Sequence, residues 1–260
     1  MIPDPNLLAL YDLHQRIQVE EHGLRREQTP EVVRQVSLGP GEGRVVYARM
    51  AADRADAVIE AQIAHYDALG QDFEWKLFGH DQPEDLKHRL LARGFEPEEP
   101  ESLLVADLEQ APANLLAPVV QDVRRLTDPG GVAAIGGILE RVWGDASPSH
   151  LAGLREALVQ DPGRVSIYLA YADGVPVSYS RTVFHDRSPF ADLCGGSTLA
   201  EYRGQGLYTA MLAARVQEAR TRGVRYLAID ASPMSLPIVR KHGFQYLTST
   251  QPFLWRVKRA

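Results

Sequence analysis

The spacing of apolar residues along the chain predicts a series of amphipathic helices. In the first of them, over 7–19, Leu7, Leu10 and Ile17 fall on one side at helical spacing. Further helices are predicted over 53–69, 83–91, 132–143, 149–159, 207–222 and 235–241. A glycine follows several of these segments, Gly70 among them, and glycine readily ends a helix.

Runs of apolar residues bounded by turn residues predict strands between these helices. The predicted strands cover 44–50, 73–78, 102–108, 119–126, 165–172, 175–185, 190–194, 226–230 and 251–257. A turn is predicted over 39–43, and Asp173-Gly174, a strong turn pair, joins two strands into a hairpin. Helices and strands alternate, so the predicted fold class is α/β (α+β).

The two halves of the chain end alike. In each, a short helix stops at a glycine, a phenylalanine follows and a strand comes next: Gly94-Phe95 in the first half and Gly243-Phe244 in the second. The pattern indicates a degenerate internal repeat, although the same connection also occurs between unrelated elements. The polar segment 109–114 is the predicted linker, which divides the chain into domains 1–112 and 118–260.

Composition narrows the class of protein. Hydrophobic residues make up 45% of the 260 positions, enough for a core. The formal net charge of −6 argues against a nucleic-acid partner, which would leave a basic patch. The one cysteine, Cys194, cannot form an internal disulfide. Residues 1–10 lack the features of a signal peptide, and no apolar stretch is long enough to span a membrane. A cytoplasmic protein without a membrane or nucleic-acid partner is therefore expected.

The stretch from Thr198 to Tyr208 is the most informative about chemistry. It lies between a predicted strand and a predicted helix, and it contains Arg203, Gly204 and Gly206. A helix N-terminus presents unpaired N–H groups and a partial positive charge. Glycines before it let the backbone approach a bulky anion, and an arginine adds a full charge. The stretch suits a pyrophosphate, with an ordinary surface loop as the alternative.

Other phosphate-binding motifs fit this stretch less well. A Walker loop requires Gly-Lys-Ser or Gly-Lys-Thr, which the chain lacks. A dinucleotide fingerprint requires three glycines after the first strand of a βαβ unit and an acidic residue about 20 residues later. The strand before Arg203 belongs instead to a region rich in hairpins.

At these residues the sequence resembles the GNAT superfamily of N-acetyltransferases. The family pattern is Arg or Gln, two residues, Gly, one residue, then Gly or Ala. Here it reads Arg203, Gly204-Gln205, Gly206, Leu207 and Tyr208. Tyr208 departs from the pattern because it replaces a small residue. The helix, strand, short helix and Gly243-Phe244 that follow keep the family's order, so the resemblance covers 118–260.

The resemblance implies two GNAT-like domains, each with a mixed, mostly antiparallel sheet flanked by helices, and acetyl-CoA as co-substrate without a metal. The strand ending at Thr198-Leu199 would offer backbone groups to the pantetheine arm and the acetyl carbonyl. The pyrophosphate would bind the loop of Arg203, Gly204, Gln205, Gly206, Leu207 and Tyr208. Gly195-Gly196 fits a bulge that parts this strand from its neighbour, with a plain bend as the alternative. Ser232 replaces an asparagine of the family and either contacts the cofactor or caps a short helix.

The implied reaction is direct attack of a neutral amine on the thioester in a ternary complex, with strand N–H groups stabilising the oxyanion. It needs a base for the amine and an acid for the leaving thiolate. The family often supplies the acid from a tyrosine at the position of Val239, which cannot donate a proton. Asp192, on the central strand, is a candidate base, with a surface carboxylate as the alternative. Tyr246, just past Gly243-Phe244, is a second catalytic candidate.

Other polar residues of this half have plainer interpretations. Cys194 could line the thioester pocket, but a lone strand cysteine is more often a small core residue. Tyr168, Tyr171 and Tyr179 could line an acceptor pocket, although sheet packing is the favoured interpretation. The eight histidines show no metal-ligand spacing.

The first half shows the ending of the repeat without its phosphate loop. After the strand over 44–50 come Asp53 and Asp56 and no glycine. Carboxylates at a helix start favour the helix but repel a pyrophosphate. This half is therefore predicted to be a degenerate copy that binds no cofactor, similar in plan to tandem relatives such as mycothiol synthase. A packed strand and a helix cap are favoured over a site formed by Trp75, Lys76, His80, Asp81 and Asp85.

Three hypotheses of function follow. The leading one is an N-acetyltransferase acting on a primary amine of a small molecule, peptide or protein. The negative net charge weakly favours a cationic acceptor such as a polyamine or aminoglycoside. The second is a catalytically inactive acyl-CoA-binding sensor or scaffold protein, which Val239 favours. The third gives the first half a structural role, with a homodimer as one form of it.

Overall fold

The computed structural model describes residues 4–39 and 41–258. It divides into two compact units. The first contains residues 1–104, 230–237 and 246–260, and the second contains residues 105–229 and 238–245. The C-terminal end of the chain therefore completes the first unit. The two contiguous domains expected from the sequence stay a prediction.

The first unit combines helices with strands from both ends of the chain. Its helices are α1 (Pro5–Tyr11), the π-helix η1 (Asp12–Ile17), α2 (Ala55–Leu69) and α3 (Leu86–Ala92). Its strands are β1 (Leu24–Gln28), β2 (Val32–Ser37), β3 (Gly43–Ala48), β4 (Phe73–Phe78), β5 (Glu96–Pro97) and β12 (Gln245–Trp255). β6 (Glu101–Asp107) begins in this unit and ends in the second.

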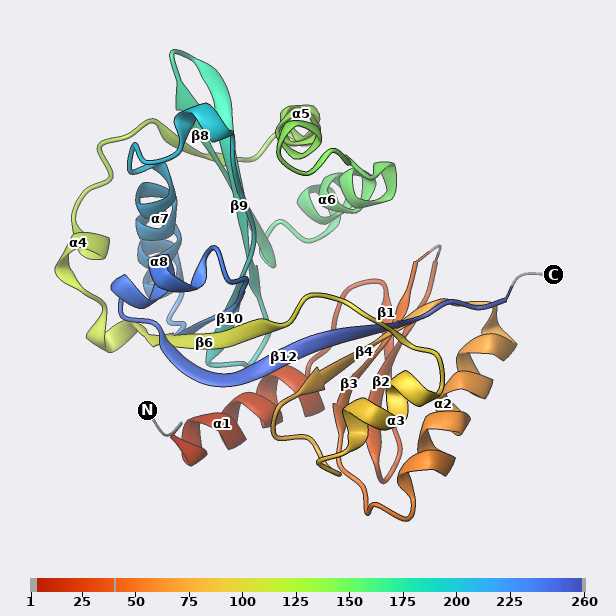
Figure 1. Ribbon diagram of the computed structural model, residues 1–260. Coiled ribbons are helices and arrows are strands. Elements are labelled where there is room, and N and C mark those ends of the chain that lie inside the picture. Colours follow the sequence, from red (N-terminus) through yellow and green to blue (C-terminus); the bar gives the residue numbers. More distant parts are fainter. Residues whose placement is uncertain (1–3, 40, 259–260) are drawn as a thin grey trace. The chain divides into compact units, whose positions relative to one another are not determined.

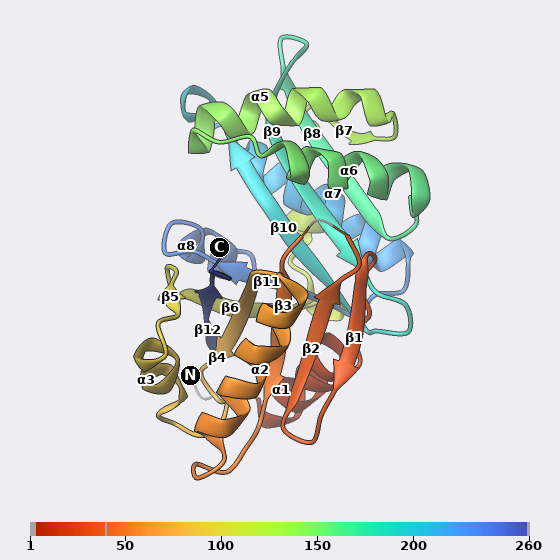
Figure 2. The same ribbon diagram turned by 90° about the vertical axis from the view of Figure 1, so that its right-hand side faces the viewer.

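The strands of the first unit lie in the order β1-β2-β3-β4-β12. Neighbours are antiparallel except β3 and β4, which are parallel and pair over Gly43–Val45 and Phe73–Trp75. Helix α2 connects these two strands, as parallel strands require a crossover. Figures 1 and 2 show α2 and α3 on one face of the sheet and α1 on the other.

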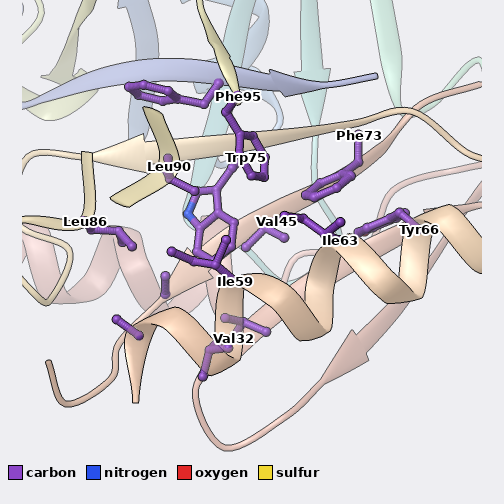
Figure 3. Packing of buried hydrophobic residues seen from close by; sticks show 14 of the residues in the cluster. Val32, Val45, Ile59, Ile63, Tyr66, Phe73, Trp75, Leu86, Leu90 and Phe95 are labelled. Atoms are coloured by element: carbon purple, nitrogen blue, oxygen red, sulfur yellow. The ribbon is translucent and has the colours of Figure 1, made fainter. Parts of the chain in front are cut away.

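The core of the first unit lies between the sheet and helices α2 and α3 (Figure 3). Phe73 and Trp75 alternate with charged residues along β4, so their rings enter the core from one face of the sheet. Tyr66 of α2 stacks on Phe73 with ring centroids 4.2 Å apart, and Phe95 meets Phe73 edge-on at 5.4 Å. Burying each such ring contributes roughly 1.5–3 kcal/mol, which anchors α2 to the parallel strand pair.

The second unit consists of strands flanked by helices on both sides. Its helices are α4 (Ala113–Leu116), α5 (Val132–Trp143), α6 (Pro148–Gln160), α7 (Leu207–Thr221) and α8 (Leu236–Lys241). Its strands are β7 (Val123–Leu126), β8 (Val165–Ala172), β9 (Val175–Phe184), β10 (Phe190–Thr198) and β11 (Tyr226–Ala231). Short 3-10 turns lie at Leu108–Gln110, Pro129–Gly131 and Ala200–Tyr202. The last two residues of β11 and the first two of α8 count with the first unit.

The strands of the second unit lie in the order β11-β10-β9-β8-β7. All neighbours are antiparallel except β10 and β11, which are parallel. Helices α5 and α6 cover one face and α7 covers the other (Figures 1 and 2). Ile135 of α5, Leu154 of α6 and Val177 of β9 belong to one hydrophobic cluster. Since both faces are covered, β8 is buried from Ser166 to Ala170 without a polar side facing water.

The two units repeat the same succession of elements. In each, a helix joins two parallel strands, and a short helix then ends at a glycine followed by phenylalanine. Gly94 and Gly243 have φ angles of +91° and +87°, and Phe95 and Phe244 are both 3% exposed. The glycines turn the chain in a conformation that is costly for other residues. The resemblance between the halves therefore extends from sequence to backbone geometry.

Most predicted elements are present, with differences at their ends. The strand over 73–78 and the helix over 132–143 have the predicted bounds. The helix predicted over 7–19 is α-helical only to Tyr11, continues as a π-helix and ends at Ile17. The last strand is Gln245–Trp255 instead of 251–257, and the predicted strand over 119–126 is only Val123–Leu126. β1 and β2 are not predicted by the sequence patterns. Pro40, in the predicted turn over 39–43, lies outside the described residues.

Candidate active site

Strands β10 and β11 pair for only a short distance. Their parallel pairing covers Phe190–Asp192 of β10, which then continues while paired with β9. The register with β9 shifts between Cys194 and Ser197, where Gly195-Gly196 opposes a single residue. Both glycines are exposed. The predicted bulge is therefore confirmed, and it follows the point where the two parallel strands stop pairing.

Space and backbone conformation both require glycine at the first position of this bulge. Gly195 has a φ of +67°, and a Cβ atom there would lie 2.9 Å from the hydroxyl oxygen of Tyr179. Tyr179 is fully buried, and its hydroxyl has no hydrogen-bond partner in the described part of the chain. A Cβ atom at Gly196 would lie 3.7 Å from the ring of Tyr208. Two tyrosines thus border the bulge.

Replacing Gly195 by alanine is expected to lower the free energy of unfolding by about 2 kcal/mol, since the new Cβ meets Tyr179 and the left-handed backbone adds strain. Gly174→Ala is the matched control. Gly174 has a φ of +78°, but an added Cβ would have nothing within 4 Å, so a loss of about 1 kcal/mol is expected. Urea unfolding measures both variants, and equal losses would contradict the close contact at Gly195.

Helix α7 begins directly after the glycine loop. Gly204 and Gly206 have φ angles of +73° and +80°, a conformation that suits glycine. Gly206 is the N-cap, and no side chain caps the first turn, so the first amides of α7 lack intrahelical partners. Arg203 and Gln205 are exposed. The Arg203 Nε donates to the Thr198 carbonyl at 3.1 Å, which holds the arginine beside this helix end.

Several residues assigned to the cofactor have structural contacts of their own. The amide of Leu199 donates to the carbonyl of Val177 at 3.0 Å, and Leu199 is 3% exposed. The Thr198 hydroxyl lies 2.7 Å from the hydroxyl of Ser178. Leu207 is buried in the hydrophobic cluster of this unit. Side chains at these positions therefore support the loop, and their assignment to the cofactor stays a prediction.

Tyr208 turns its hydroxyl into the interior. The hydroxyl oxygen is buried without a hydrogen-bond partner among the described residues. Burial raises the pKa of Tyr208, so the hydroxyl keeps its proton at neutral pH. Arg215, further along α7, is 2% exposed, and burial lowers its pKa. The ring of Tyr208 lies beside Gly196, where an added Cβ atom would make an ordinary van der Waals contact at 3.7 Å.

Val239, Ser232 and Tyr246 lie in different surroundings. Val239 is fully buried, so it contributes packing. The Ser232 hydroxyl accepts a hydrogen bond from the amide of Ser235 at 3.4 Å, just before α8, which is the contact of a capping residue. Ser232 and Tyr246 belong to the first unit, whereas Asp192 belongs to the second.

Asp192 occupies the last position of β10 that pairs with β11. Its carboxylate lies 2.7 Å from Nε2 of His185, and the side chains are 30% and 6% exposed. The sequence analysis did not single out His185. The spacing around a β-turn was the available signal, because side chains on the two arms of a hairpin can lie diagonally across from each other on one face of the sheet.

Both faces of the sheet in the second unit carry further polar contacts. Trp143, at the end of α5, donates from Nε1 to the Ser197 hydroxyl at 2.9 Å and is 63% exposed. Tyr168 donates to Glu218 at 3.0 Å, and Arg124 lies over the ring of Tyr171. Tyr168 and Tyr179 are therefore packed in the sheet, as the favoured interpretation predicted. Cys194 is half-buried.

A family model matches this part of the chain. Residues 133–244 match the model described as "Acetyltransferase (GNAT) family". The GNAT assignment therefore holds for this segment of the chain. The matched segment contains the bulge, the glycine loop and helix α7, so the GNAT signature coincides with the site described above.

Solved structures share the GNAT fold over nearly the whole chain. A GCN5-related N-acetyltransferase from Kribbella flavida has a TM-score of 0.66 at 15% identity, with 89% of each chain covered. A conserved protein of unknown function from Staphylococcus epidermidis ATCC 12228 has a TM-score of 0.65 at 13% identity, covering 96% of this chain and 98% of that one. A tandem GNAT protein of clavulanic acid biosynthesis has a TM-score of 0.60 at 14% identity, covering 100% and 90%.

Other comparisons and searches are negative. No curated protein sequence matches this chain. Within residues 4–39 and 41–258, no helix is both long and apolar enough to cross a bilayer. The same residues contain no group of three or more His, Cys, Asp or Glu side chains that could hold a metal ion.

In the first unit, an arginine occupies the corresponding place beside the parallel strands. β3 pairs with β4 up to Val45, and the next carbonyl, of Val46, accepts a hydrogen bond from Nε of Arg16 at 2.9 Å. The Arg16 guanidinium lies over the ring of Phe78, with Cζ 3.7 Å from the centroid, and Arg16 is 1% exposed. The first unit thus has a buried side chain where the second has an exposed bulge.

Acidic neighbours surround Arg16. Its Nη2 donates to Asp81 at 2.5 Å and its Nη1 to Asp12 at 2.8 Å, and Nε2 of His80 lies 2.9 Å from Asp12. Burial raises the pKa of Asp81 against the effect of Arg16. Burial also acts on Asp12, but hydrogen bonding with His80 and the charge of Arg16 hold its pKa below the usual value. The shifts differ because the Asp12 side chain is 17% exposed and that of Asp81 only 1%.

The residues considered for a site in the first half separate into three surroundings. His80 and Asp81 meet around Arg16, which the sequence analysis missed because a polar residue in a helix looks exposed. Trp75 is fully buried in the core. Lys76 forms an ion pair with Asp230, and Asp85 pairs with Arg89 at 2.9 Å.

Proposed function

We propose that the second unit transfers the acetyl group of acetyl-CoA to a primary amine. The observation that carries this proposal is the exposed Gly195-Gly196 bulge where β10 stops pairing with β11, followed by the uncapped N-terminus of α7. Uncapped amides and the positive end of a helix suit a pyrophosphate. Arg203 adds a charge at the same helix end. These residues therefore fit the phosphate part of acetyl-CoA.

The reaction balances without a covalent enzyme intermediate. The neutral amine nitrogen attacks the thioester carbonyl, a C–N bond forms and the C–S bond breaks. The nitrogen loses one proton to a base, and the leaving thiolate takes one from water or from an acid. Asp192 is the proposed base, because its carboxylate is partly exposed at the last paired position of β10. Val239 cannot supply the acid, and Tyr246 remains the candidate from the sequence.

The first unit is proposed to bind no acetyl-CoA. Arg16 donates a hydrogen bond to the carbonyl of Val46 and lies over the ring of Phe78. The arginine side chain therefore occupies the space between β3 and β4 that a cofactor arm would need. Helix α2 also begins without a preceding glycine pair, and Asp56 lies in its first turn, where a carboxylate repels phosphate. The buried arginine and the acidic helix start both support a first unit that is a degenerate copy without a cofactor.

Calorimetric titration with acetyl-CoA tests the proposal. We expect one acetyl-CoA to bind per chain. Release of free thiol in the presence of a polyamine, an aminoglycoside or a peptide with a free amine then tests transfer. Turnover with any of them would exclude an inactive sensor or scaffold. Binding of two molecules per chain would contradict the assignment of the first unit, and absence of binding would overturn the proposed function itself.

A further inference from the structure

We propose that His185 is a positioning residue that holds Asp192 in the orientation needed to take a proton from the acceptor amine. This inference rests on the proposed function, because Asp192 is the proposed base. His185 lies outside the glycine motif, in the turn between β9 and β10. In this proposal the imidazole orients the carboxylate, and the carboxylate accepts the proton.

His185 and Asp192 lie on neighbouring arms of the β9–β10 hairpin. Asp192 pairs with Val183 across β10 and β9, and His185 lies two residues past Val183. Side chains two residues apart on a strand share a face, so His185 and Asp192 form a diagonal pair on one face of the sheet. Their contact of 2.7 Å is a short, charge-assisted hydrogen bond.

The turn between β9 and β10 fixes the backbone of His185. The carbonyl of His185 accepts a hydrogen bond from the amide of Ser188 at 3.3 Å. The Ser188 hydroxyl accepts one from the amide of Phe190 at 3.1 Å. Arg187 adopts a φ of +59°, a conformation that non-glycine residues seldom take. A local strain of this kind is maintained only where surrounding contacts enforce it.

The two ring nitrogens of His185 lie in different surroundings. A carboxylate only accepts hydrogen bonds, so Nε2 of neutral His185 carries the proton and Nδ1 carries a lone pair. Nδ1 is buried and has no hydrogen-bond partner among the described residues. If His185 served packing alone, the ring would bury a polar atom without a hydrogen bond and gain no functional contact in exchange. Within residues 4–39 and 41–258, the ring hydrogen-bonds through Nε2 to Asp192.

The side chains of His185 and Asp192 differ in exposure, which indicates which of them contacts the substrate. The His185 side chain is 6% exposed, whereas that of Asp192 is 30% exposed. A substrate amine can therefore reach the carboxylate but not the imidazole. Because His185 engages Oδ2, the carboxylate cannot rotate freely, and Oδ1 is left to accept the proton. After the C–N bond forms, the proton passes from Asp192 to water, and the thiolate takes one from water.

Substitutions that keep or remove the N–H donor test the inference. His185→Leu removes the donor, and His185→Gln places an amide N–H near the position of Nε2. We expect His185→Leu to lower kcat about 10- to 100-fold with an unchanged KM for acetyl-CoA. His185→Gln is expected to retain kcat within about threefold. His88→Leu, at an exposed position of α3, is the matched control and is expected to leave both constants unchanged.

A double-variant cycle separates positioning from loss of stability. Asp192→Asn removes the base and is expected to lower kcat at least 100-fold. The combined His185→Leu, Asp192→Asn variant is expected to be no slower than Asp192→Asn alone, because residues that act as one unit are not additive. Additive losses would overturn the inference.

Long-range ¹H–¹⁵N spectra of the histidine rings give a readout independent of turnover. His185 is expected to show the Nε2–H tautomer in the intact chain and to change in Asp192→Asn. A normal kcat in His185→Leu overturns only the role of His185. An intact chain that shows the His185 signal but acetylates no amine overturns the proposed function and this role with it.

Discussion

Gly206→Glu is expected to weaken acetyl-CoA binding by about 100-fold or more, equivalent to about 2.7 kcal/mol. Gly206 is the N-cap of α7 and has a φ of +80°, so any side chain there strains the loop. A carboxylate also places negative charge where a pyrophosphate would bind and cancels the positive helix end. Calorimetric titration of the variant and the intact protein measures the loss.

Gly223→Glu is the matched control for this experiment. Gly223 follows the other end of α7, has a φ of +76° and is exposed. It therefore receives the same strain and charge as Gly206 while lying away from the helix N-terminus. Its acetyl-CoA affinity is expected to stay within about twofold of the intact protein. An equal loss in both variants would show that strain alone accounts for the effect.

Arg16→Met is expected to lower the free energy of unfolding of the first unit by about 3–5 kcal/mol. The substitution keeps much of the apolar volume but leaves Asp81, with a side chain 1% exposed, without its cationic partner. It also leaves the carbonyl of Val46 without the Arg16 hydrogen bond. Chemical denaturation followed by tryptophan fluorescence detects the loss, since Trp75 is buried in this unit.

Two further variants show whether charge burial is the cause. Arg25 pairs with Glu27 at the surface and has a side chain 55% exposed, so Arg25→Met is expected to change stability by less than about 1 kcal/mol. Arg16→Met combined with Asp81→Asn removes the uncompensated carboxylate. It is expected to be more stable than Arg16→Met alone. No recovery in the double variant would assign the loss to packing against Phe78 instead.

Local sequence signals were sufficient for elements whose side chains follow a clear period. The strand over 73–78 and the helix over 132–143 have the predicted bounds because apolar residues alternate in the first and recur at helical spacing in the second. β1 reads Leu-Arg-Arg-Glu-Gln and carries no such pattern. Its charges are held by neighbours, as in the pair of Glu27 with Arg34 of β2. An edge strand stabilised in this way cannot be predicted from hydrophobic periodicity.

In the candidate site, too, the features set by neighbouring residues were predicted and those set by strand pairing were not. The glycine loop was found because its conformation depends on residues adjacent in sequence, and Gly204 and Gly206 do adopt positive φ angles. The contact of His185 with Asp192 depends on the register between two strands. The burial of Arg16 depends on residues of β3 and β4 far along the chain. Neither contact leaves a periodic pattern of apolar residues in the sequence.

The path of the chain has a consequence for its synthesis. β12 closes the sheet of the first unit by pairing with β4, and it is synthesised after the strands and helices of the second unit. Phe253 of β12 is fully buried in the core of that unit. The first unit therefore cannot complete its sheet until β12 has been synthesised, after all residues of the second unit. A nascent or truncated chain lacking residues 246–260 exposes the edge of β4 and the apolar surface that Phe253 covers, which makes it a target for chaperones and proteases.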